Sequence, residues 1–224
     1  MKKISILCIA LFLSLNALAQ ENKGLDNRFY FRLGYSNPNN SFMGYGESPY
    51  QDFLSKTGGV FELGSIFMLN NLDLGDGLRL GINVDYAEVT FHYFEYDDDF
   101  EQVLFGTIQV SSKVGPSLSF SPVNRLVFDG FIKLKVPWFA IGYFSADDPD
   151  IDEEVYTGAI AFGYSAGINI RYGILMIGFD YNNSSIKMNN TEDSNDYLGN
   201  FFDLGDDSDK SKFSYYSITI GLNF

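Results

Sequence analysis

Acidic side chains are the groups in this chain whose number and spacing most directly suggest chemistry. The densest cluster comprises Asp147, Asp148, Asp150, Asp152, Glu153 and Glu154. Carboxylate oxygens are the ligands that Ca²⁺ and Mg²⁺ prefer, so this cluster is a candidate for weak binding of either ion. It is not an EF-hand, because Glu153 stands where that loop needs glycine and Ala159 where it needs glutamate. A solvated acidic loop explains the same residues, and both interpretations stay open here.

Histidine occurs once, at His92, between Phe91 and Tyr93. As a general base it would need a nearby serine nucleophile. The candidate nucleophiles are Ser111, Ser112 and Ser165. We instead expect His92 to belong to an aromatic girdle at a strand end, and therefore predict no catalytic residue and no cofactor beyond a weakly bound Ca²⁺ or Mg²⁺. A metal site of the His/Cys kind is excluded by counting, since the chain has one histidine and one cysteine.

The carboxyl-terminal residues 211–224 alternate with a period of two, as a strand does. One face carries Tyr216, Ile218, Ile220, Leu222 and Phe224, and the other carries Tyr215, Ser217, Thr219, Gly221 and Asn223. At the other end of the chain, Lys2 and Lys3 precede an apolar run and the small residues Ala17 and Ala19. This pattern predicts a cleaved signal peptide over residues 1–19, followed by one β domain over residues 20–224.

Seven further segments carry strand signals, and no segment reads as a long amphipathic helix. With the carboxyl-terminal strand, the predicted strands are residues 28–35, 59–69, 78–93, 103–120, 126–143, 155–171, 174–188 and 211–224. The connections between them alternate long and short, beginning with a long one. Short turns on the side of both termini and longer loops opposite are typical of a transmembrane barrel.

The polar faces of these strands carry both signs of charge. The charged residues predicted on them are Arg28, Arg32, Glu62, Arg79, Asp85, Lys113, Asp129, Lys133, Lys135, Arg171 and Asp180. Eight strands enclose only enough space for side chains to fill, so we expect these residues to pack as an ionic plug. Two prolines fall within predicted strands, and we expect Pro116 near the rim on the side of the short turns and Pro137 at a bulge beside Trp138.

The signal peptide, the strand rhythm and the terminal phenylalanine together resemble the small eight-stranded outer-membrane barrels of the OmpA/OmpX type. The resemblance implies an all-β, eight-stranded, antiparallel up-and-down transmembrane β-barrel in the outer membrane, with membrane lipid, lipopolysaccharide and the barrel assembly machinery as partners. Divalent ions at the acidic cluster would then bridge to anionic lipopolysaccharide.

The expected role is non-enzymatic: structural, or interaction with an extracellular protein through acidic loops. The excess acid behind the net charge of −14 lies almost entirely in the four longer loops, and it argues against nucleic acid as a partner. The last loop, with Tyr197, Phe201 and Phe202 amid acid, is the expected contact surface.

Two alternatives remain open on sequence. Alternation alone does not say which face lies inside, so a soluble lipocalin-like barrel around an apolar ligand fits the same pattern. A lipid hydrolase or acyltransferase using His92 is the other alternative.

Overall fold

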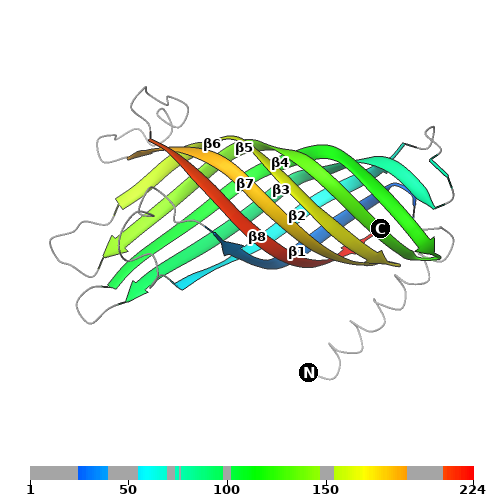
Figure 1. Cartoon of the computed structure of the whole chain (residues 1–224). Coiled ribbons are helices and arrows are strands. Elements are labelled where there is room, and N and C mark those ends of the chain that lie inside the picture. Colours follow the sequence, from blue (N-terminus) through cyan, green and yellow to red (C-terminus); the bar gives the residue numbers. More distant parts are fainter. Residues whose placement is uncertain are drawn as a thin grey trace, which may run out of the picture.

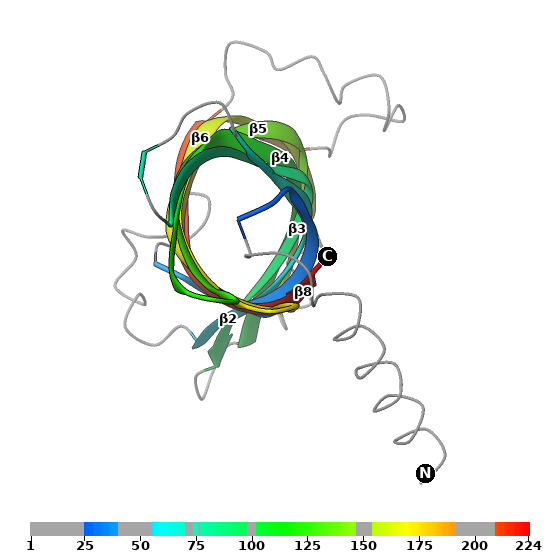
Figure 2. The ribbon, with the colours of Figure 1, turned by 90° about the vertical axis from the view of Figure 1, so that its right-hand side faces the viewer.

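A computed structural model of the chain describes residues 25–39, 55–69, 74–75, 77–97, 102–146, 154–190 and 209–224. These residues form eight strands in one closed antiparallel barrel (Figures 1 and 2). The strands are β1 (Arg28–Pro38), β2 (Ser55–Met68), β3 (Leu78–Asp97), β4 (Gln102–Val123), β5 (Leu126–Ala146), β6 (Glu154–Tyr172), β7 (Leu175–Asn190) and β8 (Asp209–Asn223). The predicted all-β up-and-down barrel is confirmed.

No helix among the described residues has the length and apolar character needed to span a bilayer.

The barrel closes between the first and last strands. Phe29 and Phe224 exchange backbone hydrogen bonds of 3.1 and 2.8 Å, and the register runs on from Tyr30 opposite Asn223 to Pro38 opposite Tyr215. The start of β1 and the end of β8 therefore lie at the same end of the barrel, as predicted. This end also holds the tight turns at residues 124–125 and 173–174.

One prediction about the connections is wrong. Only residues 98–101 separate β3 from β4, fewer than the residues between β2 and β3. The reason is that β3 continues over the acidic segment to Asp97, which pairs with Gln102 across the ladder. Residues 147–153 are longer than the turns at residues 124–125 and 173–174 but shorter than the connection over residues 69–77. Residues 39–54 and 191–208 are longer than every connection at the opposite end, as predicted.

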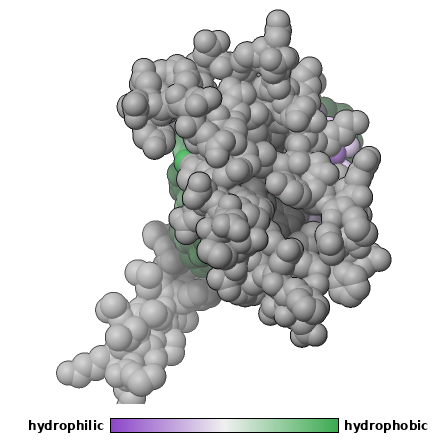
Figure 3. Space-filling view, turned by 90° about the vertical axis from the view of Figure 1, so that its left-hand side faces the viewer, coloured by the Kyte–Doolittle hydropathy of each residue, from purple (hydrophilic) through white to green (hydrophobic). Residues whose placement is uncertain are grey.

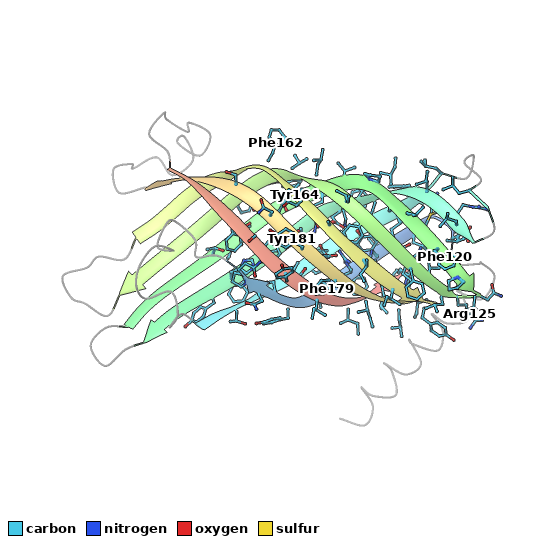
Figure 4. All side chains as sticks on the ribbon, viewed as in Figure 1. Phe120, Arg125, Phe162, Tyr164, Phe179 and Tyr181 are labelled. Atoms are coloured by element: carbon cyan, nitrogen blue, oxygen red, sulfur yellow. The ribbon has the colours of Figure 1, made fainter. Side chains whose placement is uncertain are left out.

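The two faces of the wall differ in chemistry, and the apolar face lies outside. Phe162 projects away from the barrel in Figure 4 and is 81% exposed, and Tyr164 and Phe179 are exposed as well. In Figure 3 the flank of the wall on the left is green, and therefore hydrophobic. Exposed apolar side chains come from all eight strands; examples are Leu33, Phe61, Phe91, Ile108, Ile132, Phe162, Ile177 and Ile220. The lipocalin-like alternative, which requires this face inside, does not describe the barrel.

A bulge in β3 changes which residues of that strand point inward. Asp85 pairs with Lys113 and Glu88 with Ser111, so Tyr86 and Ala87 together stand opposite Ser112. Beyond the bulge the alternation is shifted by one residue, as an inserted residue requires. The inward residues of the outer half of β3 are consequently Glu88, Thr90 and His92, all buried.

A second bulge lies in β5 at the predicted place. Val110 pairs with Phe139 and Ser111 with Pro137, which leaves Trp138 as the extra residue. Proline has no N–H to donate, so it fits where the ladder is interrupted. The prediction for Pro137 is confirmed. Pro116 stands opposite Ile82 on the exposed face, in the half of β4 nearer the short turns.

Candidate functional site

The barrel interior holds ten charged side chains that are almost completely buried. The five cations are Arg32, Lys113, Lys133, Lys135 and Arg171, and the five anions are Glu62, Asp85, Glu88, Asp129 and Asp180. Charged groups of this kind are almost never fully buried unless they are paired. Among the described residues the two signs balance, and every one of the ten has an opposite charge within reach. The predicted ionic plug is present, but two of the residues predicted for it, Arg28 and Arg79, are only half-buried near the short-turn end and do not belong to these ten.

Lys113 of β4 lies at the centre of the larger group of charges. Its Nζ atom is 2.6 Å from Glu62 Oε1 and 3.3 Å from Asp85 Oδ2, and it also contacts Glu88 Oε2. Those carboxylates come from β2 and β3, so one ammonium group joins three acids on two strands. We call the eight residues linked in this way the interior ion network. They are Arg32, Glu62, Asp85, Glu88, Lys113, Lys133, Lys135 and Asp180.

Two lysines of β5 extend the network across the lumen. Lys133 Nζ lies 2.7 Å from Asp85 Oδ2, and Lys135 Nζ lies 2.7 Å from Glu88 Oε1. Lys135 also donates a hydrogen bond of 3.0 Å to the Tyr215 hydroxyl, which in turn donates to Glu88 at 3.0 Å. These contacts join β3, β5 and β8 through the interior, although the three strands are not neighbours in the wall.

Arg32 of β1 completes the network on the other side. Its Nη2 atom lies 2.5 Å from Glu62 Oε2 and 3.0 Å from Asp180 Oδ2, and its Nη1 atom donates to Asn169 Oδ1 at 2.5 Å. The guanidinium lies against the backbone of Gly178, where any Cβ atom would collide with Arg32 Nη1. Glycine at this position therefore makes room for the arginine.

A separate ion pair and an apolar cluster occupy the end with the short turns. Arg171 holds Asp129 through two atoms, with Nε to Oδ2 at 2.6 Å and Nη2 to Oδ1 at 2.8 Å. Tyr30, Ile66, Met68 and Met176 pack together as buried neighbours. The Tyr30 hydroxyl links this cluster to the ion network because it donates to Asp85.

All eight strands contribute a side chain to these interior contacts. In strand order they include Arg32, Glu62, Asp85, Lys113, Lys133, Asn169, Asp180 and Tyr215. Removing one partner of a buried pair leaves an uncompensated charge, which costs about 3–5 kcal/mol. The network thus acts as a set of cross-links through the lumen. It leaves none of these carboxylates free to act as a base or to hold a metal ion.

The predicted metal ligands fall outside what the structure describes. Asp147, Asp148, Asp150, Asp152 and Glu153 lie outside the described residues, and Glu154 begins β6 with its side chain outside them. Within the described ranges, no group of three or more His, Cys, Asp or Glu side chains could hold a metal ion.

The girdle position predicted for His92 is wrong. His92 is buried in the interior, where its Nε2 atom lies 3.0 Å from the hydroxyl of Ser36 and its ring packs against Phe213 and Tyr215 at centroid distances of 4.9 and 4.8 Å. The bulge at Tyr86 and Ala87 is the cause, because strict alternation along β3 would turn His92 outward.

None of the three serines proposed as nucleophiles is hydrogen-bonded to this histidine. Ser111 donates to Glu88, Ser112 donates to the backbone of Tyr86, and the hydroxyl of Ser165 is buried without a partner. Ser36, which does contact His92, was not a sequence candidate. Glu88 was also missed as an interior charge, and the bulge explains this omission too.

An apolar outer face, a polar interior and an even number of antiparallel strands are the combination that bilayer-spanning barrels require. The described residues of this chain show this combination in an eight-stranded closed barrel.

The comparisons with known proteins find solved structures of low sequence identity. No protein-family model and no curated protein matches the sequence. Among solved structures, the chain is similar to Ail, the attachment invasion locus protein of Yersinia pestis, solved in complex with the heparin analogue sucrose octasulfate: the identity is 14%, the TM-score is 0.43, and the match covers 89% of this chain and 99% of that one. The outer membrane protease OmpT from Escherichia coli matches at 10% identity and a TM-score of 0.46, over 88% of this chain and 95% of that one. Neisserial surface protein A matches at 9% identity and a TM-score of 0.37, over 88% of this chain and 95% of that one. At these values the likeness gives no information about function.

Proposed function

We propose that this protein is an outer-membrane barrel that carries out no catalysis, forms no wide pore, and acts as a scaffold that presents its acidic loops at the cell surface. The observation that carries the proposal is the interior ion network, whose side chains fill the lumen from every side. A lumen crossed by Lys113, Lys133, Lys135 and Arg32 together with their acids leaves no wide aqueous path.

The outer wall supports the membrane location. Its exposed residues are large and apolar on every strand, as in Leu33, Ile132 and Ile220, which are 55%, 63% and 62% exposed. Soluble monomers rarely expose contiguous apolar patches above a few hundred Å². A surface of this kind running around the whole barrel fits hydrocarbon as its surroundings.

The interior also supports a non-enzymatic role. Ser36 and His92 form the described contact most like a nucleophile and base, and both side chains are fully buried. Among the described carboxylates in the interior, each is engaged by a cation, so none stands ready to orient the histidine. Function would then reside in the loops, where the sequence places its acid and where lipopolysaccharide-bridging divalent ions or an extracellular protein would bind.

The proposal is tested by insertion and conductance together. Protein refolded from urea into detergent should migrate differently on an electrophoresis gel with and without boiling, and its strands should resist protease in phospholipid vesicles. In planar bilayers the same preparation should show no large, voltage-independent current steps.

Two results would contradict the proposal. Folded protein that stays monomeric in buffer without detergent would contradict the proposed membrane location. Large reproducible current steps from heat-modifiable protein would show that the interior ion network does not close the lumen, and the scaffold role would give way to transport.

A further inference from the structure

The outer face of the β7–β8 pair changes in chemistry along its length. The register of this pair runs without a shift from Leu175 opposite Leu222 to Met188 opposite Asp209. A continuous register keeps the alternation with a period of two, so every second pair lies on the outer face. Beginning at the end with the short turns, these outer pairs are Leu175 with Leu222, Ile177 with Ile220, Phe179 with Ile218, Tyr181 with Tyr216, Asn183 with Ser214, Ser185 with Lys212 and Lys187 with Lys210. The face thus passes from apolar residues through tyrosine and small polar residues to lysine.

The tyrosines of this series indicate where the hydrocarbon ends in the proposed membrane location. Tyr181 contacts Tyr164 of β6 and Tyr216 of β8, at ring-centroid distances of 6.1 and 5.1 Å. Asn183, the next outer residue of β7, donates a hydrogen bond of 3.4 Å to the Tyr181 hydroxyl. Tyrosine is enriched at the head-group level of a bilayer, where its ring has apolar surroundings and its hydroxyl is hydrated. The outer residues beyond these tyrosines therefore face polar head groups.

Three lysines lie beyond this boundary on the same outer face. Lys187 stands directly opposite Lys210, and Lys212 stands opposite Ser185 in the neighbouring outer pair. We call Lys187, Lys210 and Lys212 the lysine patch. Like charges directly opposite each other in an antiparallel ladder are destabilising. An anion bound at the lysine patch removes this repulsion, so the arrangement indicates an anionic partner.

The register neighbours of the lysine patch on the outer face include no acid among the described residues. On the β6 side, Ala159 stands opposite Lys187, and the next outer pair is Thr157 with Asn189. Asp209 is the acid nearest in sequence, but it adjoins Lys210 along β8 and so lies on the inner face by the same alternation. The partner of the lysine patch therefore comes from outside the described part of the chain.

The height of the lysine patch fits a thick, phosphorylated head group. Lys212 is four residues from Tyr216. Four residues span about 13 Å along a strand, which is about 10 Å in height at a tilt of about 40°. The head-group region on one side of a bilayer is about 5–8 Å thick, and lysine stems reach back towards it along apolar surface. Lys187 and Lys210 stand one outer pair higher, about 5 Å. A head group built of sugars extends further than that of a phospholipid, and it reaches all three lysines.

We propose that the lysine patch binds the phosphate groups of a phosphorylated glycolipid in the outer leaflet of the membrane. A phosphate monoester carries a charge of about −1.5 to −2 at pH 7 and accepts charge-assisted hydrogen bonds from ammonium groups. The acyl chains of the lipid would lie along the apolar pairs of the same face, Phe179 with Ile218 and Ile177 with Ile220, which are all exposed. This inference rests on the proposed membrane location. It goes beyond the proposed function because the site is on the wall and needs neither the acidic loops nor a divalent ion.

The test measures binding of diphosphoryl lipid A to refolded protein in an uncharged detergent, by native mass spectrometry. EDTA is present throughout, so that divalent ions bridging to the acidic loops do not contribute. Wild-type protein should bind this lipid at least about tenfold more tightly than the same lipid A without its phosphates. Combined substitution of the lysine patch, Lys187→Gln with Lys210→Gln and Lys212→Gln, should abolish that preference.

Lys56→Gln is the matched control. Lys56 also lies near the end of its strand opposite the short turns, but it is two residues from Gly58, where a Cβ atom would point at the buried His92. By alternation Lys56 is therefore on the inner face of β2. Its substitution removes the same charge and should leave the preference for phosphorylated lipid A unchanged.

Three results would overturn the proposal. Equal binding of lipid A with and without phosphates would mean that contact with the acyl chains alone holds the lipid. An unchanged preference in the triple variant would mean that the phosphates bind elsewhere. Binding of phosphatidylglycerol as tight as that of diphosphoryl lipid A would exclude a site built for a glycolipid.

Folding is checked separately from lipid binding. Each variant is first tested for heat-modifiable migration, and if the triple variant fails, Lys210→Gln alone replaces it and should weaken the preference about threefold or more. Insertion and conductance are measured on protein without lipid A. Failure of the proposed function is therefore distinguishable from failure of the lysine patch.

Discussion

At the scale of single residues, Asp85 of β3 is an acid that links side chains from three other strands, β1, β4 and β5. It receives Lys133 at 2.7 Å, Lys113 at 3.3 Å and the hydroxyl of Tyr30. Asp85→Asn keeps the shape of the side chain and removes its charge, which leaves Lys133 without its partner. We expect the free energy of unfolding, measured by urea titration in detergent, to fall by about 3–5 kcal/mol.

Asp26→Asn is the control for this measurement, because Asp26 is exposed before β1. Its substitution should change the free energy of unfolding by less than about 0.5 kcal/mol. A similarly small effect of Asp85→Asn would mean that water or neighbouring groups compensate Lys133, and the cross-linking role of the network would be wrong.

Gly178 offers a second test at this scale. A Cβ atom at this position would collide with Arg32 Nη1 and lie 2.5 Å from Thr219 Oγ1. Gly178→Ala should therefore displace the guanidinium and lower the free energy of unfolding by about 1–3 kcal/mol. Gly130→Ala is the matched control, because a Cβ atom on Gly130 meets nothing within 4 Å. The same urea titration compares the two, and equal stability of both variants would contradict the close approach of Arg32.

At the scale of strands, the sequence predicted which residues face inward and outward in most of the barrel, but the prediction failed in the outer half of β3. The period of two assigned the inward and outward faces of β1, β5, β7 and β8 correctly, because a half-buried strand imposes that alternation on its residues. The bulge beside Pro137 was also predictable from sequence, because proline has no N–H to donate to the ladder. The bulge at Tyr86 and Ala87 has no such residue to mark it. Glu88 and His92 were misplaced for that reason alone.

The β3 bulge leads to a prediction about deletions. Removing Ala87 abolishes the extra residue and restores strict alternation with both Asp85 and Glu88 facing inward. Removing Val84 instead turns Asp85 outward, because every later residue moves by one position. We expect the Ala87 deletion to give heat-modifiable protein with a two-state urea transition, and the Val84 deletion to give none. Failure of both deletions would show that the bulge itself is required.

At the scale of the whole molecule, the exposed apolar face predicts that the cost of a charged substitution depends on its depth in the bilayer. Ile132 is 63% exposed and lies six residues after the start of β5, and Val123 is 59% exposed at the last residue of β4, at the end with the short turns. An arginine on the lipid face costs about 2–4 kcal/mol at the middle of a bilayer and about 0–1 kcal/mol near its edges. Ile132→Arg should therefore lower the free energy of unfolding in phospholipid vesicles far more than Val123→Arg. Equal effects would argue against a bilayer around this wall.

What sequence could not provide at this scale is the pairing of interior charges. The buried charges of the polar faces were predicted apart from Glu88, but several of their partners come from strands that are not neighbours in the wall. Lys135 with Tyr215 and Arg32 with Asp180 are separated by much of the chain. Such pairs depend on the registers around the ring and on the bulges, and neither can be read from a single strand. The expected sites on residues 147–153 lie outside the described residues and stay predictions.

The distribution of buried charge over the wall also constrains the order of events during biogenesis. A single hairpin such as β3 with β4 carries Asp85, Glu88 and Lys113 on one face, and each charge left in hydrocarbon costs about 2.5–3.5 kcal/mol. Lys133, Lys135 and Glu62, which complete this set, come from β5 and β2. The β3–β4 hairpin can therefore not enter the bilayer at low cost and wait for its neighbours. Crossing the membrane and closing the ring should be one kinetic step, with the charged face kept wet until the last strand arrives.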